Sequence, residues 1–291
     1  MESYQFLLNL AIILLSTKVL GLVTRKFHMP QVVGALLAGV ILGPAVLDML
    51  HETEFLDKLA EIGVIVLMFC AGLETDTREL KKSGKSAFII ALIGVIVPLA
   101  GGYAVAAYFN RPSVIASDAS GTAFLQNMFI GVILTATSVS ITVETLKELG
   151  KLKTHSGNAI LGAAIIDDVL GIIALTIITS MADSNVNLVT VLLKIAAFFL
   201  LSGVGGVIVY RLFARWSNNA EHGLQRHTIA AFALCLLLSF AAEKFFGVAD
   251  ITGAYIAGVI ISNTQKSQYL TSKFDTLSYL LLSPVFFASI G

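Results

Sequence analysis

A succession of apolar segments, each about long enough to cross a membrane, dominates this sequence. A membrane-spanning helix needs roughly 20 predominantly apolar residues. These runs are continuous, whereas a barrel strand alternates over about ten residues. We therefore expect an all-α polytopic membrane protein. Its ten predicted helices cover residues 3–24, 30–50, 57–75, 86–109, 124–149, 156–181, 188–213, 226–246, 250–264 and 275–291.

The composition excludes an ordinary soluble protein. Only 13% of the 291 residues are charged and the mean hydropathy is +0.87, while soluble proteins carry roughly 25% charged residues. The formal net charge is zero, so we expect a lipid bilayer around the chain and no nucleic-acid partner. Cys70 and Cys235 lie inside apolar runs without metal or disulfide spacing, and we expect no cofactor.

Lysine and arginine are distributed unevenly between the two sides of the predicted bundle. Fourteen of the 19 lie in or next to odd-numbered connections, and three lie in even-numbered ones. Basic residues concentrate on the cytoplasmic side of a membrane, which places the N-terminus outside. Residues 3–24 follow no basic region and precede no small-residue cleavage site, so we expect a retained helix there.

An internal repeat links the two ends of the chain. GALLAGVI at 34–41 matches GAYIAGVI at 253–260 at six of eight positions, with an offset of 219. Chance similarity between Gly/Ala-rich helices is the alternative, which the ungapped continuation to Gly72 and Gly291 disfavours. A shift of seven predicted helices requires opposite orientations, and inverted repeats are typical of secondary transporters. The second copy should extend to roughly residue 400, so we expect a fold truncated after about ten helices.

Two adjacent acids, Asp167 and Asp168, stand in the middle of the apolar stretch AILGAAIIDDVLGIIALTIITS at 159–180. A charged carboxylate at the bilayer centre costs about 3 kcal/mol or more. A buried hydrogen-bonded acid or a helix–helix ion pair is the alternative, but no single basic residue nearby could neutralise both acids. Ionisation of one carboxyl disfavours ionisation of the other. The pair can therefore exchange a proton for a hard cation such as Na⁺, which favours oxygen ligands.

Hydroxyl side chains are concentrated in LTATSVSITVETL at 134–146. They are Thr135, Thr137, Ser138, Ser140 and Thr142. These hydroxyls can simply bond back to helix carbonyls, as is common in membranes. Alternatively, the fifth predicted helix is interrupted here, which would expose backbone carbonyls and half-helix ends to ions. Glu144 lies further along, and we expect it at the membrane interface.

Four motifs resemble the monovalent cation/proton antiporter superfamily. They are AIIDDVLGIIAL, TATSVSIT, PQVVGALLAGVILGP at 30–44 and SPVFFASIG at 283–291. The Asp-Asp pair is similar to that of the electrogenic bacterial sodium/proton antiporters. This resemblance implies an inverted-repeat antiporter fold with interrupted crossing helices.

The resemblance also implies roles for individual residues. Asp168 would be the main ion and proton carrier, binding Na⁺ transiently. Asp167 would pair with a lysine, or bind Na⁺ or the proton itself. Thr137 and Ser138 lie where the interrupted helix of the family crosses its partner near these acids. The family's lysine comes from a helix after residue 291, so this sequence departs from the pattern there.

The domain organisation follows from the same resemblance. Residues 1–75 and 216–291 would form a scaffold that makes a homodimer. Residues 76–182 would form half of the ion-transport core, and residues 183–215 a linking helix. The remaining core helices would be absent. We expect this protein in the bacterial inner membrane.

The resulting functional hypothesis is a secondary active transporter that exchanges Na⁺ or Li⁺ for H⁺ by alternating access. It would not be an enzyme. K⁺/H⁺ exchange is the alternative within the superfamily. A passive cation channel is more remote, and so is an intramembrane aspartyl protease, because a protease needs one aspartate on each of two facing helices.

Smaller features have simpler interpretations. We expect His155, His222 and His227 to be solvated residues of cytoplasmic connections. Lys18 and Lys194 would extend toward the interface or face the scaffold. Pro98 and Pro284 should kink their helices. Close helix contact is expected at Gly203, Gly205 and Gly206.

Overall fold

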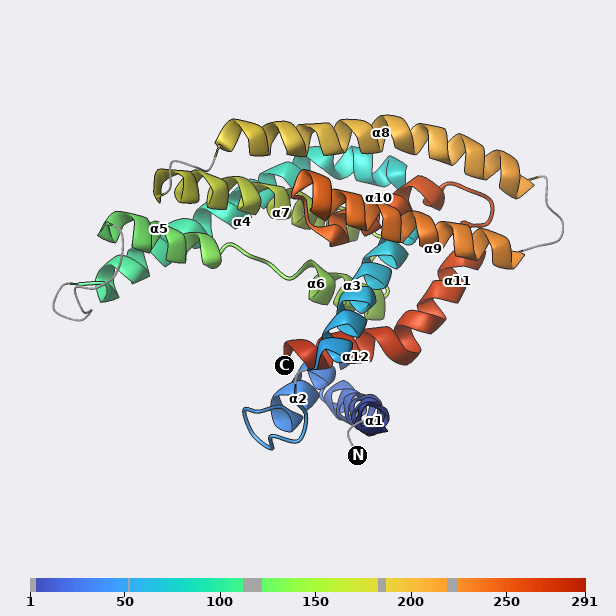
Figure 1. The fold of residues 1–291 in the computed structure, drawn as a ribbon, viewed down its shortest axis with the longest axis horizontal. Helices are drawn as coiled ribbons and strands as arrows, with labels where there is room; N and C mark the ends of the chain where they lie inside the picture. The colour runs from blue at the N-terminus through green and yellow to red at the C-terminus, as the bar shows by residue number, and fades with distance from the viewer. Residues whose placement is uncertain (1–3, 52, 112–121, 183–186, 219–223) are drawn as a thin grey trace.

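The computed structural model describes residues 4–51, 53–111, 122–182, 187–218 and 224–291, and every regular element in these ranges is helical (Figure 1). The elements are α1 (Gln5–Lys26), α2 (Gln31–Leu42), α3 (Glu54–Glu74), α4 (Thr77–Phe109), α5 (Ala123–Ile133), α6 (Val139–Glu148), α7 (His155–Ala182), α8 (Leu188–Asn218), α9 (Leu224–Ala241), η2 (Ala242–Phe246), α10 (Asp250–Ser262), α11 (Ser267–Leu277), η3 (Ser278–Leu282) and α12 (Ser283–Ile290). The η elements are π-helical.

Several helices have the length that a membrane demands. Within the described ranges, five are long and apolar enough to cross it: α1, α4, α7, α8, and α9 continued by η2. A helix satisfies its own backbone hydrogen bonds, which the hydrocarbon region of a bilayer cannot do. The shorter apolar helices α2, α5 and α10 pack among them. The predicted all-α polytopic membrane protein is therefore confirmed.

Several predicted helices differ from the structure at their ends: the fourth, expected from residue 86, begins at Thr77, and the seventh, expected to end at 213, reaches Asn218. The second was expected to reach residue 50, but α2 ends at Leu42. Gly43 is extended, because the residue before a proline, here Pro44, is disfavoured in the helical region. The tenth was expected from residue 275, but α11 begins at Ser267 and passes through η3 into α12. Pro284 lies in the first turn of α12, directly after this π segment.

The fifth predicted helix, 124–149, is interrupted. α5 ends at Ile133, α6 begins at Val139, and the residues between them are not helical. Thr135 donates its hydroxyl to the carbonyl of Val132 at 2.8 Å, which closes the end of α5. Ser138 caps the N-terminus of α6 by accepting a hydrogen bond from the Ile141 N–H at 3.3 Å. Local side-chain bonds of this kind compete with a continuous helix.

The internal repeat is visible in the helix starts. α1 and α9 begin at Gln5 and Leu224, and α2 and α10 begin at Gln31 and Asp250. Both pairs differ by 219 residues, which is the offset of the sequence repeat. The two copies of this helix pair therefore have equal lengths of chain between corresponding starts.

Glycine contacts confirm that the two copies are packed equivalently. A Cβ added to Gly34 would lie 2.5 Å from the backbone of Leu20 in α1, and one added to Gly253 would lie 2.8 Å from Ser239 in α9. Leu20 and Ser239 again differ by 219. Small residues let helix backbones approach this closely.

The copies also cross each other. Gly39 of α2 lies against the backbone of Ala288 and Gly291 at the C-terminal end, and Gly258 of α10 lies against Phe69 and Gly72 of α3. Adding 219 to the numbers of Gly39, Phe69 and Gly72 gives those of Gly258, Ala288 and Gly291, so the two sets of contacts are equivalent. Each α2-type helix therefore packs on the α3-type helix of the opposite copy, as a two-fold repeat requires.

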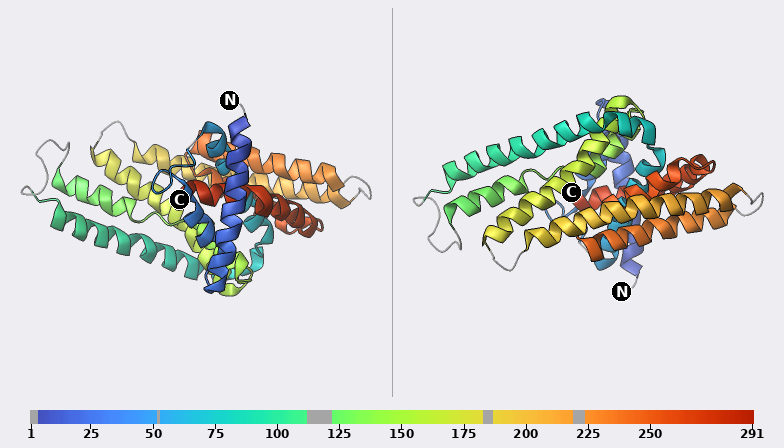
Figure 2. Two further views of the ribbon diagram at one scale, coloured as in Figure 1. Left: turned by 90° about the horizontal axis from the view of Figure 1, so that it is seen from below. Right: turned by 90° about the horizontal axis from the view of Figure 1, so that it is seen from above.

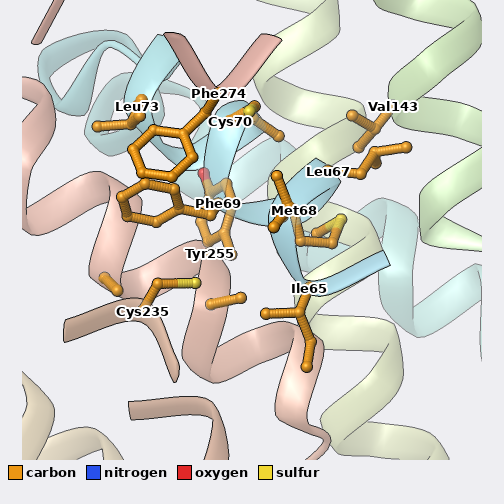
Figure 3. Close-up of a cluster of buried hydrophobic side chains, with 14 of the residues drawn as sticks. Ile65, Leu67, Met68, Phe69, Cys70, Leu73, Val143, Cys235, Tyr255 and Phe274 are labelled. Atoms are coloured by element: carbon orange, nitrogen blue, oxygen red, sulfur yellow. The ribbon is translucent and has the colours of Figure 1, made fainter. Parts of the chain in front are cut away.

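The main apolar core surrounds α3. Phe69 is fully buried and makes an edge-on ring contact with Phe274 of α11 at 5.0 Å, as Figure 3 shows. Tyr255 of α10 reaches the same cluster and its hydroxyl lies 3.1 Å from that of Thr75. Cys70 and Cys235 are buried here as free thiols.

Two groups of helices are distinguishable in space. α4, α5 and α7 pack against one another and run together, whereas α1, α2 and α12 form a separate packed group (Figure 2). α3 extends from that second group toward α10, and α6 packs on α2, α3 and α7. The segment between α5 and α6 therefore leads from the first group toward the second.

α8 corrects one prediction about small residues. Around Gly203 and Gly205, a Cβ would meet no other element within 4 Å among the described residues, so the expected close helix contact is wrong there. Gly206 does approach a neighbour, because a Cβ would lie 2.9 Å from the Ile260 side chain of α10. The neighbouring apolar residues Val204 and Val207 are exposed, which fits the outer position of α8 in Figure 1.

Candidate functional site

The acid pair lies near the middle of α7. Asp167 and Asp168 are the thirteenth and fourteenth of its 28 residues. Adjacent residues of an α-helix point about 100° apart, so the two carboxyl groups have different surroundings. Asp167 is buried, with 8% of its surface exposed, and Asp168 is half-buried.

The surroundings of Asp167 come from α4 and from the interrupted helix. The hydroxyl of Thr137 lies near the Asp167 carboxyl and donates to the carbonyl of Thr135 at 3.4 Å. On the other side, a Cβ added to Gly94 of α4 would lie 3.7 Å from Asp167 Oδ1. The structure therefore brings one hydroxyl of the interruption to the acid pair, as the resemblance implied.

One oxygen of this buried carboxyl has no partner. Within the described part of the chain, no group forms a hydrogen bond with Asp167 Oδ1. A buried polar atom normally has a hydrogen-bond partner, and a missing one costs about 1–3 kcal/mol. An unsatisfied anionic oxygen in a transmembrane helix is the arrangement that a cation or a proton can relieve.

Ser138 has a different role in this geometry. Its hydroxyl is engaged as the N-cap of α6, and its carbonyl accepts the Thr142 hydroxyl at 2.9 Å. The contact with the acid pair is made by its neighbour Thr137. Ser138 fixes where α6 begins, and the partly positive N-terminus of that half-helix favours anionic groups in its vicinity.

α4 and α7 approach each other through small side chains. Ala87 and Ala91 of α4 and Ala163 of α7 form one buried cluster. A Cβ added to Gly162 would lie 3.2 Å from that of Ala87, so the two helices are in close contact over this stretch. That contact sets the position of the α7 acids against α4.

A second charged cluster was missed by the sequence analysis. Lys147, in the last turn of α6, pairs with Asp275 of α11 and, at 3.4 Å, with Glu74 at the end of α3. Glu74 also pairs with Lys153 at 3.3 Å, and its side chain is only 12% exposed. Glu74 lies 73 and 79 residues before its partners Lys147 and Lys153, and Lys147 lies 128 residues before Asp275, so no local signal could have joined them.

The histidine prediction is wrong for His227. Its side chain is 1% exposed, and its ring lies 4.2 Å from that of Trp216, centroid to centroid. The reason is that α9 begins before it, so residue 227 already faces α8. His155 is exposed and lies 3.6 Å from Glu79, while His222 falls outside the described residues.

Lys18 and Glu144 border one cavity of about 250 Å³ between α1, α2, α6 and α12. The ammonium of Lys18 lies 3.9 Å from the ring centre of Tyr279, a favourable cation–π distance. Glu144 is half-buried, so it is less exposed than an interfacial residue. Lys194 is exposed on α8.

Comparison with known proteins agrees with this arrangement. The transmembrane sodium/hydrogen exchanger family matches residues 11–291. The chain is 39% identical over 290 residues to the probable Na⁺/H⁺ antiporter GerT of Bacillus cereus, covering 98% of this chain and 73% of GerT. It is also 39% identical over 293 residues to the Na⁺/H⁺-K⁺ antiporter GerN of the same organism, covering 99% and 71%.

A solved structure shares the fold. The sodium proton antiporter MjNhaP1 of Methanocaldococcus jannaschii superposes with a TM-score of 0.66 at 18% identity, over 100% of this chain and 71% of that one. At this identity the likeness shows the fold alone. Together with the family match along nearly the whole sequence, it leads to one conclusion: this chain belongs to the sodium/hydrogen exchanger family.

Proposed function

We propose that this protein exchanges Na⁺ for H⁺ across a membrane, with Asp167 and Asp168 as the groups that bind both ions. The observation that supports it most is the buried Oδ1 of Asp167, which lacks a hydrogen-bond partner in the described residues and has a second acid next to it. Family membership and the antiporter names of the relatives point to the same chemistry.

Competition between the two ions follows from the cost of charge in the membrane. A charged carboxylate there costs about 3 kcal/mol or more, and a second one next to it adds repulsion. Either a proton or Na⁺ lowers this cost, but both need the same oxygens. A site that either ion can neutralise can therefore change sides with Na⁺ bound in one direction and with a proton bound in the other. This couples the two ion gradients.

The movement is proposed to be alternating access between two packed bodies. α4, α5, α6 and α7 (residues 76–182) would belong to a mobile ion-transport core, while residues 1–75 and 216–291 would form a scaffold that dimerises, with 183–215 as the link. The separate packing of α4–α5–α7 and of α1–α2–α12 supports this division. Lys147, Glu74 and Asp275 would then hold core and scaffold together at one end.

The membrane placement is also a proposal. The excess of basic residues in the odd-numbered connections supports an N-terminus outside the cell and the Glu74–Lys147 cluster on the cytoplasmic side. The organism named for the two relatives above is a bacterium, which supports a location in the bacterial inner (plasma) membrane. Accessibility labelling of cysteines placed in these connections would test this orientation.

A second candidate cation is K⁺. The relative GerN is named a Na⁺/H⁺-K⁺ antiporter, and carboxylate oxygens can bind either ion. Adding Na⁺, Li⁺ or K⁺ separately to vesicles with an imposed pH gradient distinguishes these options. A passive channel would instead carry cation current without collapsing the pH gradient.

The test uses the intact protein in everted vesicles or proteoliposomes with a pH-sensitive dye. Wild type should dissipate the pH gradient when Na⁺ is added, and Asp168→Asn should not, because an amide cannot exchange a proton for a cation. Asp57→Asn, at an exposed position in the first turn of α3, is the matched control and should behave like wild type. Normal exchange by Asp168→Asn would remove this residue from the mechanism.

A further inference from the structure

The unpartnered Oδ1 of Asp167 faces α4 at a residue without a side chain. A Cβ built on Gly94 would lie 3.7 Å from this oxygen, and no other element comes within 4 Å of the Cβ position among the described residues. The space beside Oδ1 is therefore open on the α4 side. Gly94 has no sequence motif around it and was not singled out by the sequence analysis.

This gap is local. Ala87 and Ala91, seven and three residues before Gly94 on α4, are 1% and 2% exposed and close the interface with α7 by their methyl groups. Residues three and four apart on a helix lie on the same face, so Gly94 continues this face. The contact between α4 and α7 is thus closely packed at these two alanines and open next to Asp167.

The same residue of α4 also has a backbone carbonyl that lacks its usual helical donor. Pro98 lies inside α4, and a proline has no N–H to donate to the carbonyl four residues earlier. That carbonyl belongs to Gly94. Its regular helical donor is missing, so its lone pairs are available to another partner. A free carbonyl oxygen and a carboxylate oxygen are both ligands that hard cations prefer.

We propose that Gly94 and Pro98 form an α4 half of the cation site, in which the Gly94 carbonyl and Asp167 Oδ1 bind the transported monovalent cation, directly or through one water. The proposal rests on the proposed exchange function and adds to it a residue pair outside the acid and hydroxyl motifs. Two features of α4 contribute: the missing side chain gives room, and the missing N–H gives the ligand.

Substitutions can fill the gap or remove the ligand separately. Gly94→Ser places a hydroxyl within hydrogen-bonding range of Oδ1 and occupies the space of the cation. Gly94→Ala adds only a methyl group at an ordinary contact distance, so it fits the fold and occupies part of the gap. Pro98→Ala restores an N–H that can bind the Gly94 carbonyl. Gly101→Ser, also on α4 with nothing within 4 Å of its Cβ position, is the matched control.

The readout is the Na⁺ concentration dependence of exchange, together with the rise in thermal unfolding midpoint that Na⁺ causes in the purified intact protein. Gly94→Ser should raise the KM for Na⁺ by about tenfold or more, which corresponds to about 1.4 kcal/mol of binding free energy. Gly94→Ala and Pro98→Ala should raise KM less, by several fold, with the maximal rate retained. Stabilisation by Na⁺ should weaken in the same order, while Gly101→Ser matches wild type.

The outcomes separate this proposal from the exchange function. If wild type exchanges Na⁺ for H⁺ and Asp168→Asn abolishes it, but Gly94→Ser and Pro98→Ala keep the wild-type KM and stabilisation by Na⁺, the α4 half-site is refuted alone. If wild type shows no Na⁺-dependent proton movement, the exchange function itself fails. A folded Gly94→Ala with an unchanged KM also overturns the proposal should Gly94→Ser not fold.

Discussion

The crossing of α3 and α10 allows a quantitative test of the fold at Gly258. A Cβ at this position would lie 2.8 Å from both Gly72 Cα and Leu73 N of α3, and closer still to the Phe69 carbonyl. Ordinary contacts begin near 3.4 Å and the Phe69 oxygen would lie about 1 Å closer than that, so the two backbones must separate by about 1 Å to admit one methyl group. Backbone atoms cannot rotate away as side chains do, so the whole crossing has to shift.

Two free-energy terms decide whether Gly258→Ala raises or lowers the free energy of unfolding. Alanine is favoured over glycine in a helix by about 1 kcal/mol, while overpacking in a well-packed interior costs about 1–3 kcal/mol, and sometimes more. Clashes with three backbone atoms place this site at the upper end. We therefore expect a net loss of about 2 kcal/mol, equivalent to a midpoint lower by roughly 4–8 °C.

The assay is thermal unfolding of the purified protein in detergent, followed by intrinsic fluorescence. Gly203→Ala on α8, where a Cβ meets no other element, should leave the midpoint unchanged or raise it. Gly39→Ala tests the equivalent crossing of the other copy and should be destabilising as well. A Gly258→Ala protein as stable as Gly203→Ala would refute the close packing of the two repeat copies.

Two further substitutions test the interrupted helix and the charged cluster. Lys147→Met removes the partner of Asp275 and Glu74, whose side chains are 32% and 12% exposed. We expect a loss of about 1–3 kcal/mol, between the values for exposed and buried pairs, measured as the unfolding midpoint; no change would show that the cluster contributes nothing. Ser138→Ala removes the N-cap of α6 and should cost about 1 kcal/mol, with Ser138→Asn restoring stability; equal stability of the alanine and asparagine variants would contradict the capping role.

Much of the fold was predictable because its signals are local. Twenty-residue apolar runs gave the helices, the repeat at 34–41 and 253–260 predicted paired elements, and the hydroxyl cluster at 134–146 indicated a possible interruption. The end of α2 was missed because the apolar run continues past Pro44, although proline chemistry at that point favours a stop.

The rest depended on contacts between distant residues. Lys147 and Asp275 are 128 residues apart, and neither stands in a motif. His227 looked like a loop residue because charged and polar residues surround it in sequence, yet the packing of α9 on Trp216 buries it. The importance of Gly94 follows only from where α7 places Asp167, which no pattern in α4 can report.

The most direct test of the central claim is whether Na⁺ and H⁺ compete for one site in the wild-type protein. The initial rate of Na⁺-dependent proton movement should be measured over a range of Na⁺ concentrations at several pH values. If both ions use the Asp167–Asp168 carboxyls, the KM for Na⁺ should rise by up to about tenfold per unit of falling pH, and saturating Na⁺ should restore the same maximal rate. A KM independent of pH, with a maximal rate that falls in acid, would contradict the account.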